Sequence, residues 1–176
     1  EVYDIPMYVN AMLGNTYAEG GLGYNSGGPT VRVLDIWKKG APAIDLLCPD
    51  IYVSSRDEFE YFCASYSRKD NALFIPESSF RGVSAAVNVI RAVAKYGAIG
   101  ICSFGAESAL DEEGNLNDEA KMAAVSIKAI NNIAPLLIKY HGTDKIHAII
   151  QEEFAINQHI KLPNYHIIAS FEGQRI

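Results

Sequence analysis

Cysteine and histidine are scarce in this sequence, and those present lack the spacing of a metal site or a disulfide framework. The three cysteines, Cys48, Cys63 and Cys102, lie far apart in apolar stretches, which predicts buried free thiols. The four histidines come late in the chain, at positions 141, 147, 159 and 166, without the spacing of zinc ligands. We therefore expect no metal and no other cofactor.

Basic clusters and long apolar runs are also missing. Lysine and arginine together number 15 against 21 acidic residues, and the resulting net charge of -6 repels the phosphate backbone of a nucleic acid. No apolar run reaches the length of a membrane span. Glu1 opens the chain without an initiator Met or a signal peptide, which suggests a piece of a longer protein. Cytoplasmic, periplasmic and extracellular locations stay equally open.

What the sequence does contain is an alternation of strand and helix patterns, in a chain whose 49% hydrophobic content suits a folded domain. Short apolar runs at 5–9, 44–53, 72–76 and 98–103 are each expected to form a strand. The second is followed by Ser55, which with Glu58 three residues later predicts a capped helix. That helix should bury one apolar face, made of Phe59, Phe62, Cys63 and Tyr66.

A further helix is predicted to start at the cap residue Asn117 and to end or kink at Pro135. Its buried side is expected to consist of Met122, Val125, Ile130 and Ile133. After residue 142 the pattern changes, because 146–150 and 165–171 resemble short strands on either side of a turn. We expect this tail to be antiparallel and to belong to a separate unit.

Successive strand and helix units predict parallel strands with right-handed crossovers. A doubly wound sheet usually has a phosphate-binding turn after its first strand, and the Gly-rich loop at 11–30 fits neither G-x-G-x-x-G nor a P-loop. A barrel places functional residues at the carboxyl ends of its strands, where Asn10, Tyr52, Glu77 and Ser103 lie. The pattern favours a barrel, of which four units are present.

Glu77 is the strongest candidate for chemistry, because its carboxylate ends an almost wholly apolar run. The structural alternative is an acid that caps the next helix or pairs with Arg81, since ion pairs of this kind are common. Position in the sequence does not decide between the two.

Three segments, PDIYV (49–53), NALFIPES (71–78) and GAIGICSFGAES (97–108), carry a family resemblance. In order and spacing they resemble the last three barrel strands of bacterial beta-galactosidase-like enzymes of glycoside hydrolase family thirty-five, in clan A. The resemblance covers about the first 140 residues. It implies an α/β fold in which 1–142 form the C-terminal half, strands 5–8, of a (β/α)8 TIM barrel. Residues 143–176 would begin a β-rich accessory domain.

The resemblance also implies the roles of individual residues. Glu77 matches the nucleophile of a retaining enzyme, and Tyr52 would stand beside it. The acid/base Glu would lie on strand four, before Glu1, since the loop acids Glu19 and Glu107 do not fit its place. A retaining glycosidase needs both carboxyl groups, about 5–5.5 Å apart, so this chain alone is expected to be inactive.

Several other residues are candidates for sugar contact. Asn10 could hydrogen-bond a sugar hydroxyl, although an Asn that begins a loop is more often a turn former. The loop aromatics Tyr17, Tyr24 and Phe104 could face a sugar ring, or pack on a neighbouring domain. The family more often has an aromatic and then Ser-Pro-Phe-Gly at its last strand. Here the first three of those positions differ, being Ile101, Cys102 and Ser103.

The leading hypothesis is therefore a fragment of a retaining glycoside hydrolase that acts on a carbohydrate such as a beta-galactoside. Its partner would be the missing N-terminal half of the barrel or a second copy, because open sheet edges must be covered. One alternative is a non-catalytic fragment that self-associates or binds carbohydrate. Another is a small doubly wound binding protein, with a ligand at a strand-order switch point.

Overall fold

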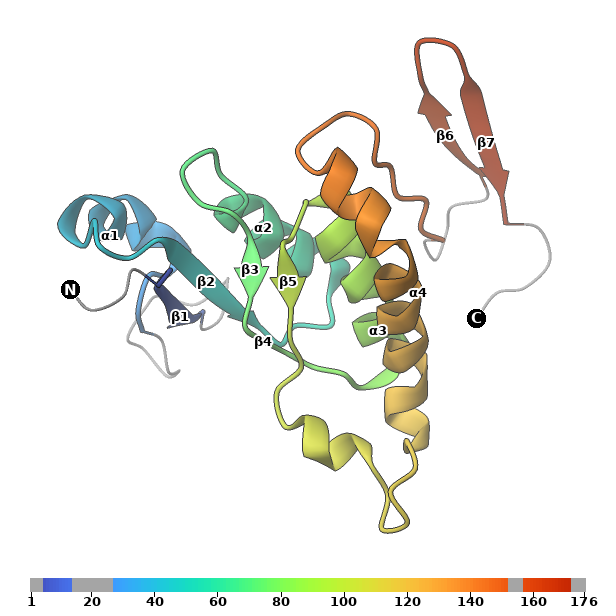
Figure 1. Ribbon diagram of the computed structural model, residues 1–176, viewed down its shortest axis with the longest axis horizontal. Helices are drawn as coiled ribbons and strands as arrows, with labels where there is room; N and C mark the ends of the chain where they lie inside the picture. The colour runs from blue at the N-terminus through green and yellow to red at the C-terminus, as the bar shows by residue number, and fades with distance from the viewer. Residues whose placement is uncertain (1–4, 14–26, 152–156, 172–176) are drawn as a thin grey trace.

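The computed structural model describes residues 5–13, 27–151 and 157–171, which form a mixed α/β body followed by a β hairpin (Figure 1). The strands of the body are β1 (Tyr8–Met12), β2 (Leu46–Ile51), β3 (Phe74–Ile75), β4 (Glu77–Ser78) and β5 (Gly100–Ile101). Its α-helices are α1 (Leu34–Gly40), α2 (Arg56–Tyr66), α3 (Gly82–Ile90) and α4 (Asp118–Tyr140). Short helical turns are η1 (Val31–Val33), η2 (Arg91–Lys95) and η3 (Ala106–Ala109).

The strands of the body are parallel and follow one another in sequence order. β1 pairs with β2, β2 with β4, and β3 with β5. β3 and β4 form a single run that changes partner at Pro76, where proline offers no N–H to either ladder. The predicted strand at 72–76 is therefore displaced by this break, and Glu77 opens β4 instead of following a strand. Asn10 likewise lies within β1 and not at its end.

One face of these strands is covered by helices. Ala11, Leu47, Ile51 and Ile75 share a core cluster with the predicted α2 residues Phe59, Phe62, Cys63 and Tyr66, all of them buried. The helix begins where the sequence predicts, since Ser55 Oγ accepts a hydrogen bond from the Glu58 N–H at 3.5 Å. Burial of each large side chain here is worth about 1.5–3 kcal/mol.

The opposite face of the strands holds the polar candidates together with aromatic side chains. Successive side chains of a strand alternate between faces, so Tyr8, Asn10 and Met12 share the side away from the α2 core. Tyr8 packs edge-on against Phe74 of β3, with ring centroids 5.2 Å apart. Tyr8 and Met12 remain 53% and 51% exposed. This face thus carries exposed apolar side chains beside its polar ones.

Helix α4 differs from its prediction in two ways. It runs unbroken through Pro135, and its expected buried side is largely exposed, with Val125 at 67%. The residues that are buried are small, Ala120 and Ala123, which let α4 lie close beside α3 (Figure 1). Several larger apolar side chains of α4 remain exposed beside this close approach.

Helix α4 is also long and apolar enough to cross a bilayer when judged by length and composition alone. The sequence predicts no membrane-spanning segment, so this candidate was not identified from it. A core helix of a soluble protein meets the same criterion. The observation alone therefore assigns no membrane location.

The tail forms an antiparallel hairpin of β6 (Asn157–Lys161) and β7 (His166–Ser170), closed by two backbone hydrogen bonds between Leu162 and Tyr165. The antiparallel prediction is confirmed, but β6 and not 146–150 supplies the first strand. Ile150 instead bonds through both backbone groups to the side-chain amide of Gln158, which takes the place of a strand partner.

Candidate functional site

Both carboxylate oxygens of Glu77 are held by hydrogen bonds from neighbouring strands. The Tyr52 hydroxyl donates to Oε2 at 2.6 Å, and Asn10 Nδ2 donates to Oε1 at 3.3 Å. Asn10 comes from β1, Tyr52 follows β2 directly, and Glu77 opens β4, so parallel pairing gathers three of the predicted residues at one place. A carboxylate with both oxygens held has a fixed plane, as a nucleophile or a general base requires.

Asp50 is a fourth member of the site, and the sequence reading missed it. It lies opposite Glu77 in the register of β2 and β4, and its Oδ1 accepts a hydrogen bond from Asn10 Nδ2 at 3.0 Å. The signal that singled out Glu77 was present here as well, since Asp50 is a carboxylate within the apolar run LLCPDIY. The two acids are thus bridged by a single amide group.

The surroundings of Asp50 disfavour its charge. Partial burial and the neighbouring Glu77 carboxylate raise the pKa of Asp50 to about 6, against the opposing effect of the Asn10 hydrogen bond. The folded protein therefore holds this proton more tightly than the unfolded chain, in which an Asp pKa is about 4. Stability contributed by the protonated form is present below about pH 4 and is lost as the pH rises through about 6.

Tyr52 is a hydrogen-bond donor at all ordinary pH values. Partial burial, the hydrogen bond to Glu77 and the charges of Glu77 and Asp50 all raise the pKa of its phenol. The hydroxyl is 2.6 Å from a carboxylate oxygen, within the range of a charge-assisted hydrogen bond. It therefore keeps its proton and can hold Glu77 at neutral pH.

A glycine pair behind Asn10 fixes the backbone of β1. Gly27 exchanges two backbone hydrogen bonds with Met12, each of 3.1 Å. Gly28 has φ +75°, and a Cβ added there would lie 2.6 Å from the Asn10 carbonyl oxygen. Only glycine allows this close approach, so Gly28 holds Asn10 in position for Glu77 and Asp50.

We expect Gly28→Ala to destabilise the protein by about 2–4 kcal/mol, because the positive φ costs about 1–2 kcal/mol and the new methyl group pushes on the Asn10 carbonyl. Urea unfolding measures the change. Gly40→Ala is the matched control, since a Cβ there meets nothing within 4 Å. Equal stability of the two variants would contradict the role given to Gly28.

The structural alternative for Glu77 fits poorly with these contacts. Arg81 pairs with Glu119 instead, with Nη1 and Oε2 3.1 Å apart. No side chain caps the start of α3. Glu77 is thus neither the partner of Arg81 nor the cap of the following helix, and its described hydrogen bonds go to Tyr52 and Asn10.

The loop after β5 lies next to the site. The Phe104 backbone N–H donates to the Ser78 carbonyl at 3.0 Å, and Ser78 Oγ donates to the Cys102 carbonyl at 2.8 Å. Phe104 is 63% exposed, so its ring is accessible. Its backbone partner, Ser78, is the residue that follows Glu77. The other loop aromatics considered for sugar contact, Tyr17 and Tyr24, lie outside the described residues, as does Glu19.

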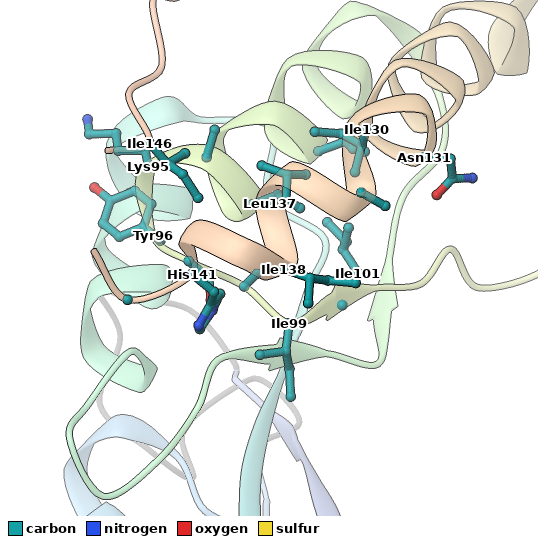
Figure 2. Close-up of a pocket in the computed structure, with 18 of the residues that line it drawn as sticks. Lys95, Tyr96, Ile99, Ile101, Ile130, Asn131, Leu137, Ile138, His141 and Ile146 are labelled. Atoms are coloured by element: carbon teal, nitrogen blue, oxygen red, sulfur yellow. The ribbon is translucent and has the colours of Figure 1, made fainter. Parts of the chain in front are cut away.

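Two cavities among the described residues bear on where a ligand could bind. One of about 120 Å³ adjoins Tyr52, Ser78 and Arg81. A larger one of about 650 Å³ lies between α4, η2 and the start of β5, with Ile101, Ile130 and Ile138 among its walls (Figure 2). Volume alone would favour the larger cavity. No carboxylate lines either cavity, so the acids Glu77 and Asp50 lie outside both of them.

The thiols and histidines supply no further site. The three cysteines are free as predicted, and Cys48 and Cys63 are buried, but Cys102 is exposed because it lies beyond the end of β5. Burial, the first cause in each case, raises the pKa of both Cys48 and Cys63 to about 12, so these thiols stay protonated. Over the described ranges, no three His, Cys, Asp or Glu side chains are grouped to hold a metal.

The chain matches no model of a known protein family, and no curated protein matches it. The family resemblance therefore rests on the three segments around Tyr52, Glu77 and Phe104 alone.

Proposed function

We propose that this chain is the nucleophile-bearing C-terminal half of the catalytic barrel of a retaining glycoside hydrolase that resembles the beta-galactosidases of family thirty-five. The observation that carries the proposal is the fixed carboxylate of Glu77, which both Tyr52 and Asn10 hold beside the carboxyl end of β2. Functional residues of TIM barrels lie at that end.

The strand order supports a barrel over a doubly wound sheet. The strands follow sequence order without a reversal in both parallel sheets, β1-β2-β4 in one and β3-β5 in the other, whereas a doubly wound sheet binds its ligand where the order reverses. Right-handed crossovers in one direction place the helices on one face. The face that carries Tyr8, Asn10, Asp50 and Phe74 would then form part of the barrel interior.

In the proposed reaction Glu77 attacks the anomeric carbon of a beta-glycoside, and the bond from that carbon to the leaving oxygen breaks. The leaving oxygen takes a proton from an acid/base Glu that we place upstream of Glu1. Water then attacks the same carbon, gives its proton to that second residue and releases Glu77. Tyr52 and Asn10 hold Glu77 in line through both steps, and Phe104 offers a face to the sugar ring.

The proposal also accounts for the exposed apolar surface. Tyr8 and Met12 would be covered by the remaining half of the barrel, and the hairpin of β6 and β7 would begin a β-rich accessory domain within 143–176. An apolar face of this kind is costly to leave in water.

A second candidate function, a non-catalytic fragment that pairs with its own copy, has support in the exposure of apolar side chains on the other side of the body. Ile138 of α4 is 78% exposed and Ile99, which precedes β5, is 55% exposed. A two-fold pairing through this side would cover Ile138 and Ile99 of both copies. Such a fragment would be a stable dimer without turnover.

Covalent labelling tests the proposed function. A 2,4-dinitrophenyl 2-deoxy-2-fluoro-beta-D-galactoside has a leaving group that needs no acid, and the fluorine slows release of the sugar, so the glycosyl-enzyme accumulates. We expect the full-length protein that carries these residues to gain one fluorosugar, which peptide mapping places on Glu77. The corresponding glucoside and mannoside test the choice of sugar.

Glu77→Gln is the matched control and should take up no label, whereas Glu112→Gln, an exposed loop variant, should be labelled like the wild type. Label on another residue, or none from any of the three sugars, would reject Glu77 as the nucleophile. Light scattering on the 176-residue chain addresses the second candidate, which requires a dimer.

A further inference from the structure

Asp50 is a charged group at the centre of the site for which the proposed reaction has no use. Its carboxylate is partly buried and stands beside that of Glu77, in register on the adjacent parallel strand. Two neighbouring acids repel each other, so a purely structural role would favour a neutral side chain at this position. We therefore expect the carboxylate of Asp50 to have a role beyond structure.

The side-chain amide of Asn10 connects Asp50 to Glu77. Its Nδ2 carries two hydrogens and lies 3.0 Å from Asp50 Oδ1 and 3.3 Å from Glu77 Oε1, so each hydrogen has one carboxylate to bond. The reversed amide would turn its oxygen toward two negative groups. With Glu77 alone only one hydrogen bond would resist that rotation, whereas Asp50 adds a second and shorter one.

We propose that Asp50 is a positioning residue, whose carboxylate orients the Asn10 amide so that Asn10 holds Glu77 Oε1 while Tyr52 holds Oε2. This inference rests on the proposed function for its effect on catalysis. It also leaves the Asn10 amide oxygen directed away from both acids, free to accept a hydrogen bond from a sugar hydroxyl. Asp50 itself touches neither the sugar nor the leaving group.

Few neighbouring groups affect the ionisation of Asp50. Glu77 faces it from β4, and Asn10 is its hydrogen-bond donor from β1. The charge of Asp50 in turn raises the pKa values of Cys48 on β2, of Tyr52 just after β2 and of Tyr66 on α2. Within the described ranges, no lysine or arginine donates a hydrogen bond to Asp50 or forms an ion pair with it. Protonation of Asp50 should therefore weaken its hold on Asn10 as the pH falls through about 6.

The first test is kinetic, on the full-length protein with aryl beta-galactosides. We expect Asp50→Ala to lower kcat about 10- to 100-fold and to leave KM within about twofold, because the variant loses alignment and not a substrate contact. Asp50→Asn keeps an acceptor without the charge. It should lose less, and the acidic limb near pH 6 should disappear from its rate profile. The exposed Asp144→Asn is the control.

The choice of leaving group separates positioning from proton donation. If Asp50 were the general acid, Asp50→Ala would cleave a 2,4-dinitrophenyl galactoside with the wild-type kcat/KM, which reports the first step, and a phenyl galactoside with a much lower one. A positioning residue slows both equally. A selective loss on the phenyl substrate, or an unchanged kcat on both, would overturn the inference and leave the assignment of Glu77 intact.

The second test needs no activity, so it also decides the inference if the proposed function fails. We expect the side-chain amide protons of Asn10, followed by nitrogen–proton NMR in the Glu77→Gln protein, to shift as Asp50 titrates, with a midpoint below the pKa of about 6 that Asp50 has beside a charged Glu77. The shift should vanish in Glu77→Gln combined with Asp50→Ala. Asn10 signals that do not move between about pH 3 and 7 in Glu77→Gln, a range that covers an ordinary Asp pKa of about 4 and the raised value, would overturn the role of Asp50.

Discussion

Replacement of Glu77 by alanine is expected to lower the hydrolysis of aryl beta-galactosides by the full-length protein on the order of 10⁴-fold or more, the scale seen when a nucleophile is removed. The side chain that forms the covalent bond is gone, and Tyr52 and Asn10 are left to face a void at the point of attack. Initial rates with a 2,4-dinitrophenyl galactoside measure the loss.

A loss of this size could also come from misfolding, so a rescue experiment carries the conclusion. The missing carboxylate leaves room for a small anion such as azide, which can attack the anomeric carbon from the side that Glu77 occupied. We expect azide to restore turnover of Glu77→Ala and to give the alpha-galactosyl azide, whose configuration is inverted. Restored turnover with a beta product would contradict the geometry proposed for Glu77.

Tyr52→Phe supplies the matched comparison. It keeps the ring and the nucleophile but removes the 2.6 Å hydrogen bond to Oε2, so we expect a loss of about 10- to 100-fold, in line with a hydrogen bond to a charged group. Azide should not rescue it, because Glu77 still fills its place. Rescue of both variants would mean that azide acts somewhere other than at the nucleophile site.

Features set by neighbours in the chain could be predicted from the sequence. The cap of α2 by Ser55 depends on residues three apart, and its buried face on helical spacing. The same holds for Asn117, which accepts the Ala120 N–H at 3.0 Å at the start of α4. In each case the contact is local, so the spacing of residue types determines it.

Features that depend on register or on distant packing could not be predicted. Asp50 and Glu77 meet only because β2 and β4 pair with these two residues opposite each other, a match fixed by tertiary structure. The change of strand partner at Pro76, from β5 for β3 to β2 for β4, depends on tertiary pairing in the same way. The predicted buried side of α4 was wrong. Helical spacing shows which residues share a side of the helix, but not which other element packs against that side.

The second large effect is expected at Asn71, which joins two elements of the core far from any chemistry. Its Oδ1 accepts the Leu47 N–H at 2.8 Å, and its Nδ2 donates to the carbonyls of Leu47 and Tyr66, each at 3.0 Å. The residue is 3% exposed, so water does not replace these bonds. The Asn71 side chain bonds both backbone groups of Leu47, as a neighbouring strand would do, and it also holds the end of α2 through Tyr66.

Asn71→Ala is therefore expected to cost about 3–5 kcal/mol, because it strands buried backbone groups at about 1–3 kcal/mol each. That is a large part of a typical stability of about 5–15 kcal/mol. Urea unfolding followed by Trp37 fluorescence gives the change, with the exposed α4 variant Asn132→Ala as a control that stays within about 0.5 kcal/mol.

Asn71→Asp makes the test specific for hydrogen bonding. The shape is kept and the Leu47 N–H still has an acceptor, but a carboxylate now faces the two carbonyls that the amide served. We expect this variant to be at least as unstable as Asn71→Ala at neutral pH and to recover partly at about pH 4, where a protonated acid can donate one hydrogen bond. An aspartate variant as stable as the wild type at neutral pH would show that the carbonyls of Leu47 and Tyr66 do not depend on the Asn71 amide.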